Sequence, residues 1–124
     1  MLMNDQLREG VHLFNERRFF ESHEVWEALY LEADARHKPF LEGLVQLAAA
    51  LRIYSDFGES QGPVRMIYQA LIRFEAYPPV YFGVKIKALS LSMQSWAKEV
   101  EQSGGAPPNP IPKISLRRFP FFIK

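Results

Sequence analysis

The chain contains no cysteine, has almost no excess charge and lacks a long apolar run. The absence of cysteine excludes disulfide bonds, thiol catalysis and cysteine-ligated zinc or iron–sulfur clusters, and it is compatible with a reducing compartment. Fifteen basic and fourteen acidic side chains leave a formal net charge of +1. Such a balance supplies no overall field to attract nucleic acid or an anionic membrane, so neither is expected as a partner.

No segment has the pattern of a targeting or membrane-spanning sequence. The first ten residues, MLMNDQLREG, include Asp5 and Glu9 and lack the apolar centre of a secretory signal. The apolar stretch GLVQLAAAL, residues 43–51, is much shorter than the roughly 18 residues that a membrane helix needs. We therefore expect a cytoplasmic protein with no membrane span.

The chain does have the material for one helical domain. It has 124 residues, of which 48% are hydrophobic and 14% aromatic, and these are enough for a real core. Apolar residues recur at spacings of three and four in successive segments, a pattern typical of amphipathic helices. The predicted fold class is all-α: a single compact bundle of about five helices at residues 1–103, followed by an extended proline-rich tail at residues 104–124. The first expected helix begins at Asn4 or Asp5, the second runs over about 19–33 and the third over about 39–57. The fourth follows a cap at Ser60, and the fifth ends before the SGG at 103–105.

Two further features concern the packing of this bundle. The third helix carries Gly43 and an alanine run, so it is small or apolar nearly all round, and we expect it at the centre. The tail holds five of the nine prolines, which favours an extended conformation. Its apolar residues indicate packing on the bundle or on a partner, including a second copy of the chain. No pair of strands with a hairpin signal is predicted.

The stretch FNERRFFESHEVWEALY places His23, Glu24 and Glu27 on one helix. His23 and Glu27 are i,i+4 neighbours, close enough for a charge-assisted hydrogen bond. Gln46 lies in the apolar third helix, where an amide needs polar partners. One hypothesis is therefore a buried network in which Glu27 holds His23 and Gln46 bridges the second and third helices. The protein would then be a structural or interaction module, and it would need no cofactor.

The alternative hypothesis gives the same residues a chemical role. A histidine with carboxylates suits Zn, Mn or Fe, so His23 and Glu27, with Glu24, are candidate metal ligands or an acid–base pair. The protein would then be a metal-binding protein or a hydrolase-type enzyme. The spacing differs from H-E-x-x-H, because position 27 is Glu, and the Glu-x-x-His pattern of di-iron bundles is absent. The pattern therefore predicts neither a catalytic residue nor a particular cofactor.

The same stretch, followed by FLEGLVQLAAAL and GESQGPVRMIYQAL, resembles the domain of unknown function 309 family over about residues 10–75. The resemblance implies a small all-helical fold without an established activity. Relatives often carry a second histidine soon after the alanine run, where this chain has LRIY. The residues that match the family's signature are Phe14, Asn15, Phe20, Glu21, His23, Glu24, Glu27, Gly43 and Gln46.

Overall fold

The computed structural model describes residues 3–117 of the chain. These residues form five α-helices, one short 3-10 helix and a two-stranded sheet, so the all-α prediction is confirmed. None of these helices is both long enough and apolar enough to cross a membrane. The elements are α1 (Met3–Asn15), α2 (Phe19–Glu32), η1 (Ala35–His37), α3 (Lys38–Phe57), α4 (Gln61–Phe74), β1 (Val80–Tyr81), β2 (Val84–Lys85) and α5 (Ile86–Ser103).

Helices α1 and α2 form an antiparallel hairpin with a short turn, in which Arg17 takes a left-handed conformation with φ of 69°. Two buried side chains of α2 hydrogen bond to carbonyl groups of α1. The Ser22 hydroxyl donates to the carbonyl of Gly10 at 2.9 Å, and the Trp26 indole donates to the carbonyl of Leu7 at 3.2 Å. Because both side chains are fully buried, these bonds fix how far α2 can slide along α1.

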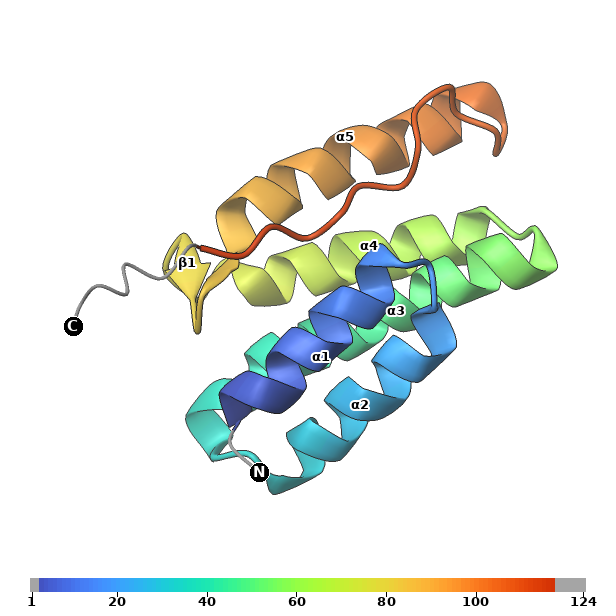
Figure 1. Ribbon diagram of the computed structural model, residues 1–124. Coiled ribbons are helices and arrows are strands. Elements are labelled where there is room, and N and C mark those ends of the chain that lie inside the picture. The colour runs from blue at the N-terminus through green and yellow to red at the C-terminus, as the bar shows by residue number, and fades with distance from the viewer. Residues whose placement is uncertain (1–2, 118–124) are drawn as a thin grey trace.

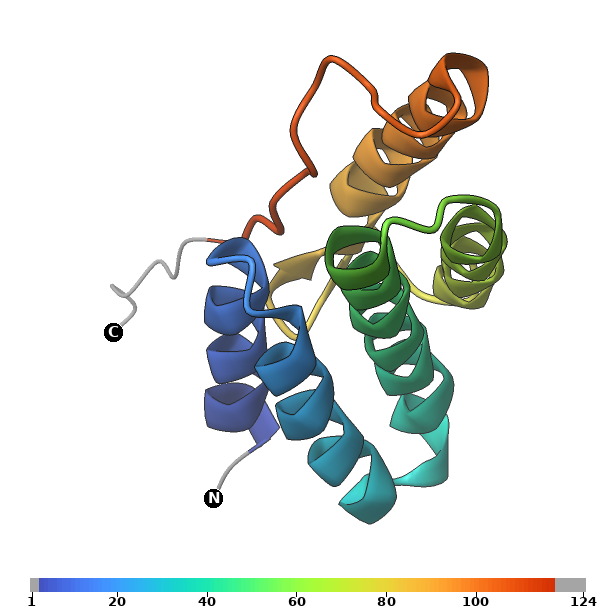
Figure 2. The same cartoon turned by 90° about the vertical axis from the view of Figure 1, so that its right-hand side faces the viewer.

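Helix α3 lies between α2 and α4, as its small and apolar surface led us to expect (Figure 2). Its buried face carries large side chains such as Phe40, Leu44 and Leu51. Gly43 lies directly against the ring of Phe74 in α4, so a side chain at this position would collide with that ring. The absence of a side chain at Gly43 therefore lets α3 and α4 pack closely.

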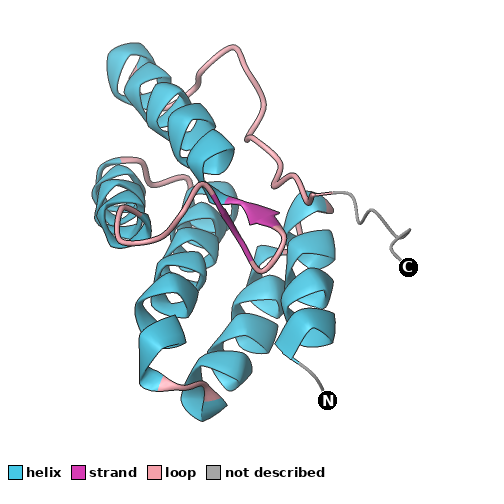
Figure 3. Ribbon diagram, turned by 90° about the vertical axis from the view of Figure 1, so that its left-hand side faces the viewer, coloured by secondary structure: helices cyan, strands magenta, loops and turns pink. Residues whose placement is uncertain are grey.

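A small hairpin connects α4 to α5, and the expectation of no strand pair was wrong (Figure 3). Val80 pairs with Lys85 and Tyr81 with Val84 in an antiparallel register. The turn between them consists of Phe82 and Gly83, which both have positive φ, at 49° and 78°. This backbone suits a two-residue hairpin, but its first position usually holds Asn, Asp or Gly, so Phe-Gly gave no signal.

The described part of the tail, residues 104–117, leaves α5 at Gly104 and runs back along it to the hairpin (Figure 1). The Trp96 indole in α5 donates to the carbonyl of Asn109 at 3.1 Å. Leu116 then pairs with Val84 in an isolated antiparallel bridge. The prediction about the last part of the tail, with its phenylalanines at 119, 121 and 122, falls outside the described residues.

Candidate functional site

His23, Glu24 and Glu27 lie together on the outer side of α2. Each offers one potential ligand atom, and the three atoms all lie within 4.8 Å of one another. The side chain of His23 is 24% exposed and that of Glu24 is 56% exposed. Nδ1 of His23 lies 3.8 Å from a carboxylate oxygen of Glu24, and Glu27 is exposed one turn further along the helix. The grouping is thus a surface cluster with a half-buried histidine.

The predicted network between α2 and α3 was wrong in its placement of Gln46. The Gln46 side chain faces α4, where its Nε2 donates to the side-chain oxygen Oε1 of Gln69 at 2.8 Å. Its own carbonyl oxygen accepts from Nε of Arg73 at 3.3 Å, and Arg73 also pairs with Glu42 at 3.2 Å. Glu42 and Gln46 are i,i+4 neighbours on the face of α3 toward α4, and α4 satisfies the amide there. Within residues 3–117, no hydrogen bond joins His23 to Gln46 or to Glu27, and His23 is not fully buried.

An aromatic residue and a cation lie beside the histidine. The Phe20 ring stacks on the His23 ring, with centroids 6.4 Å apart and an interplanar angle of 21°. The guanidinium carbon of Arg52 in α3 lies 4.5 Å from the centroid of the Phe20 ring, and the same guanidinium pairs with Asp56 at 3.4 Å. These contacts restrict the His23 ring from one side, whereas the two glutamates are exposed.

The other residues of the family signature have structural roles in the described chain. Phe14 is fully buried and packs edge-on against Phe19 at 5.1 Å between ring centroids. Glu21 pairs with Arg18 on the surface at 3.5 Å. Asn15 binds the main chain of the tail through both ends of its amide group. No local pattern in the sequence could have indicated that partner, because it lies 99 positions away.

Residues 7–56 match the family model Domain of unknown function (DUF309). The match confirms the family resemblance from Leu7 in α1 through α2 and η1 to nearly the end of α3. It ends before α4, whereas the sequence motifs suggested an extent to about residue 75. No curated protein matches the chain. All three residues of the surface cluster lie inside the DUF309 match, whereas the hairpin, α5 and the tail lie outside it.

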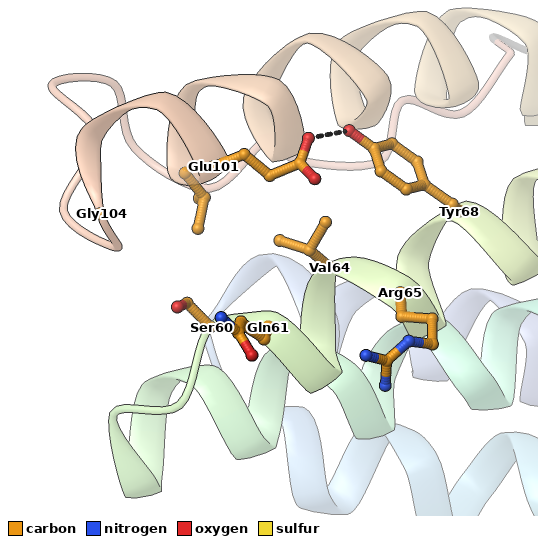
Figure 4. Close-up of a pocket in the computed structure, with 8 residues that line it drawn as sticks. Ser60, Gln61, Val64, Arg65, Tyr68, Glu101 and Gly104 are labelled. Carbon is orange, nitrogen blue, oxygen red and sulfur yellow. Dashed lines mark hydrogen bonds between the residues drawn. The ribbon is translucent and has the colours of Figure 1, made fainter.

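Two openings of about 610 Å³ each lie outside the DUF309 match, between α4 and α5. In the first, the Tyr68 hydroxyl donates to a carboxylate oxygen of Glu101 at 2.9 Å (Figure 4). Burial raises the pKa of Tyr68 above 10.0, and the hydrogen bond and negative charge of Glu101 raise it further. Neither opening is lined by His23, Glu24 or Glu27, so neither supplies a substrate pocket for the surface cluster.

Leu71, Ile72 and Leu91 give the second opening a more apolar lining. The first is lined by Ser60, Gln61, Val64, Arg65, Tyr68, Val100, Glu101 and Gly104.

Proposed function

We propose that α2 binds one divalent transition-metal ion through His23, Glu24 and Glu27. The observation that carries the proposal is the mutual distance of at most 4.8 Å between the three potential ligand atoms. One imidazole nitrogen with two carboxylate oxygens is a donor set that suits Zn, Mn or Fe(II) better than Ca or Mg. This function would also account for a half-buried histidine beside two exposed acidic residues.

The exposure of the two glutamates supports closure around an ion. Metal–ligand bonds of about 2.0–2.2 Å place two ligands of a tetrahedral ion roughly 3.3–3.6 Å apart. Binding would therefore require the exposed Glu24 and Glu27 side chains to rotate until the three atoms, which lie within 4.8 Å of one another, share one shell. His23 would stay in place, because the Phe20 ring stacks on it.

Three ligands from one helix would occupy one side of the ion. A tetrahedral ion would keep at least one further position for water or for a donor from another molecule. We therefore propose a binding site, and the contacts of the described residues identify no substrate.

The second candidate function is a structural or interaction module, as one hypothesis from the sequence proposed. Its basis is now the tail instead of a buried network around His23. The observation that favours it is the tail, which crosses the chain and is held by the distant residues Asn15 and Arg17. That role would depend on the tail-binding surface, which is formed by Asn15, Arg17 and the hairpin, and is independent of metal binding.

The chain offers a matched control for the metal proposal. His12 on α1 and Glu16 in the turn after it also form an i,i+4 pair, at 2.9 Å, but Arg18 lies 3.7 Å from the same Glu16 carboxylate. Metal-free, tag-free protein would be titrated with Zn²⁺ and with Mn²⁺ by isothermal calorimetry. We expect one equivalent to bind, and His23→Ala or Glu27→Gln to raise the Kd more than about tenfold, which corresponds to about 1.4 kcal/mol.

The control variant His12→Ala should bind the ion as the unchanged chain does. Binding that survives His23→Ala, or that falls equally with His12→Ala, would show that the ion does not use the α2 cluster. Circular dichroism of each variant would establish that the helices remain folded.

A further inference from the structure

The tail is held mainly through its main chain. The Asn15 amide nitrogen donates to the carbonyl of Ile114 at 2.9 Å, and the Ile114 N–H donates to the Asn15 amide oxygen at 2.7 Å. Arg17 donates to the carbonyl of Ile111 at 2.8 Å. Asn15 and Arg17 thus bind an extended segment through its main chain, as a neighbouring strand would.

The hairpin continues the same mode of binding. The Lys85 N–H donates to the carbonyl of Ser115 at 3.0 Å, and the Arg117 N–H donates to the carbonyl of Gly83 at 2.7 Å. Residues 115–117 therefore extend the two-stranded sheet at the edge formed by β2. Adding an extended segment to a sheet edge through main-chain bonds is a common mode of peptide recognition.

Apolar side chains determine the position of the segment on the tail-binding surface. Ile114 is 3% exposed, and Ile111 and Leu116 are partly buried against the core. Ser115, between Ile114 and Leu116, is exposed. The tail-binding surface therefore accepts an extended peptide with apolar residues at these three positions, and residues 111–117 of the chain itself meet that requirement.

We propose that the tail-binding surface also accepts residues 111–117 of a second copy of this chain, so that two copies exchange their tails. The segment from the second copy is identical, so it makes the same hydrogen bonds and buries the same side chains. The two arrangements differ only in the path of the connection from α5. A higher protein concentration favours the exchanged arrangement, because it involves two copies. This inference is independent of the metal proposal, because it uses none of the α2 cluster.

The connection has the composition of a hinge that can open. Gly104 and Gly105 have φ values of 78° and 119°, a conformation that glycine adopts without strain. Prolines follow at 107, 108 and 110, and proline-rich segments are extended and stiff. The Tyr54 hydroxyl donates to the carbonyl of Gly105 at 2.7 Å, which fixes the start of the hinge. Residues 106–108 are thus the part that would redirect the tail toward a second copy.

The absence of cysteine allows a direct test with engineered cysteines. Val84 and Leu116 face each other between two flanking hydrogen bonds, a pair whose Cα atoms lie about 4.5 Å apart in antiparallel strands. This separation suits a disulfide. Val84→Cys and Leu116→Cys chains, one of them isotope-labelled, would be mixed at high concentration under mild oxidation. A disulfide-linked heterodimer, identified by mass spectrometry, is expected.

The matched control replaces Leu116→Cys by Ser115→Cys, because the side chain at 115 points to the other face of the strand. The double variant Val84→Cys/Leu116→Cys should close within one chain. Exchange is overturned if the first mixture gives no more heterodimer than the control mixture, and the pairing itself is overturned if the double variant does not close.

A second measurement uses the full chain without cysteine. Deleting residues 106–108 shortens the connection by about 10 Å at full extension, which disfavours return of the tail to the binding surface of its own chain. Light scattering after size exclusion should show a larger dimer fraction than the unchanged chain at equal concentration. An unchanged or smaller dimer fraction contradicts the proposal.

Discussion

Helices α1–α3 and helices α4–α5 are held together in different ways. In the first region, the buried side chains Ser22 and Trp26 bond to main-chain carbonyls of the neighbouring helix. In the second, the Tyr68 hydroxyl of α4 bonds to the Glu101 carboxylate of α5 at an exposed position, and two openings of about 610 Å³ each lie between these helices. The comparison shows that apolar burial alone does not bring two helices into full contact.

Small residues explain much of the difference. Gly10 in α1 lies against the indole of Trp26, and at this point the backbone of α1 approaches α2 closely. Between α4 and α5, the larger side chains of Tyr68 and Leu71 line the second opening instead. The match to DUF309 coincides with the closely packed region, and so does the α2 cluster. A metal ion there would be bound by a helix that its neighbours hold rigidly.

The largest effect on this comparison should come from Gly10→Ala. The new methyl carbon would lie 2.5 Å from two carbons of the Trp26 ring and closer still to its nitrogen. The indole cannot move away easily, because it is fully buried and bonded to Leu7. We expect the free energy of unfolding, measured by urea denaturation, to fall by about 1–3 kcal/mol.

Gly62→Ala is the matched control in the open region. Apart from its two chain neighbours and the nearby backbone of α4, no atom of the described chain lies within 4 Å of the position that its methyl carbon would take, and Gly62 is helical in α4. Alanine favours the helix over glycine, so we expect unchanged stability or a gain of up to about 1 kcal/mol. Equal losses in the two variants would contradict the proposed difference between the regions.

A smaller loss of stability is expected for Asn15→Ala, which tests how the tail joins the two regions. The variant removes both hydrogen bonds between Asn15 and Ile114. The partly buried main-chain N–H and carbonyl of Ile114 then lack the Asn15 side-chain amide as their partner. A cost of about 1–2 kcal/mol in the free energy of unfolding follows from two such bonds. The substitution should also increase the rate of amide hydrogen exchange more at Ile114 than at Trp26. Unchanged exchange at Ile114 would show that the hairpin alone holds the tail.

Much of the helical fold could be predicted from the sequence, because it depends on local patterns. The apolar spacing located all five helices, and the small residues of α3 placed it at the centre of the bundle. The hairpin was missed because its strands have two residues each and its turn begins with Phe82. Periodicity cannot detect strands of that length.

The candidate site was only partly predictable, for a related reason. His23, Glu24 and Glu27 are close together because they share one helix, so their spacing in the sequence was sufficient. The partner of Gln46 depends on which neighbouring helix its side chain faces, and at this position the neighbour is α4 rather than α2. The binding of the tail by Asn15 depends on the complete fold and has no local signal.

The smallest expected effect is a change in one pKa in the open region. Glu101→Gln removes the negative charge beside the Tyr68 hydroxyl but leaves an amide oxygen that can accept its hydrogen bond. The pKa of Tyr68, followed by NMR of its ring carbons, should fall yet stay above 10.0, because burial is the largest cause of its increase. Glu99→Gln is the control, since Glu99 accepts from Asn109 and not from a tyrosine.

The raised pKa of Tyr68 determines how the stability of the fold changes with alkaline pH. A tyrosine whose pKa is higher in the folded chain stabilises the fold fully below pH 10.0, its usual pKa, and loses that contribution as the pH rises through the folded value. The unchanged chain should therefore lose more stability in this alkaline range than Glu101→Gln does. If both lose the same amount, the contact between Tyr68 and Glu101 does not couple α4 to α5, and burial alone accounts for the raised pKa.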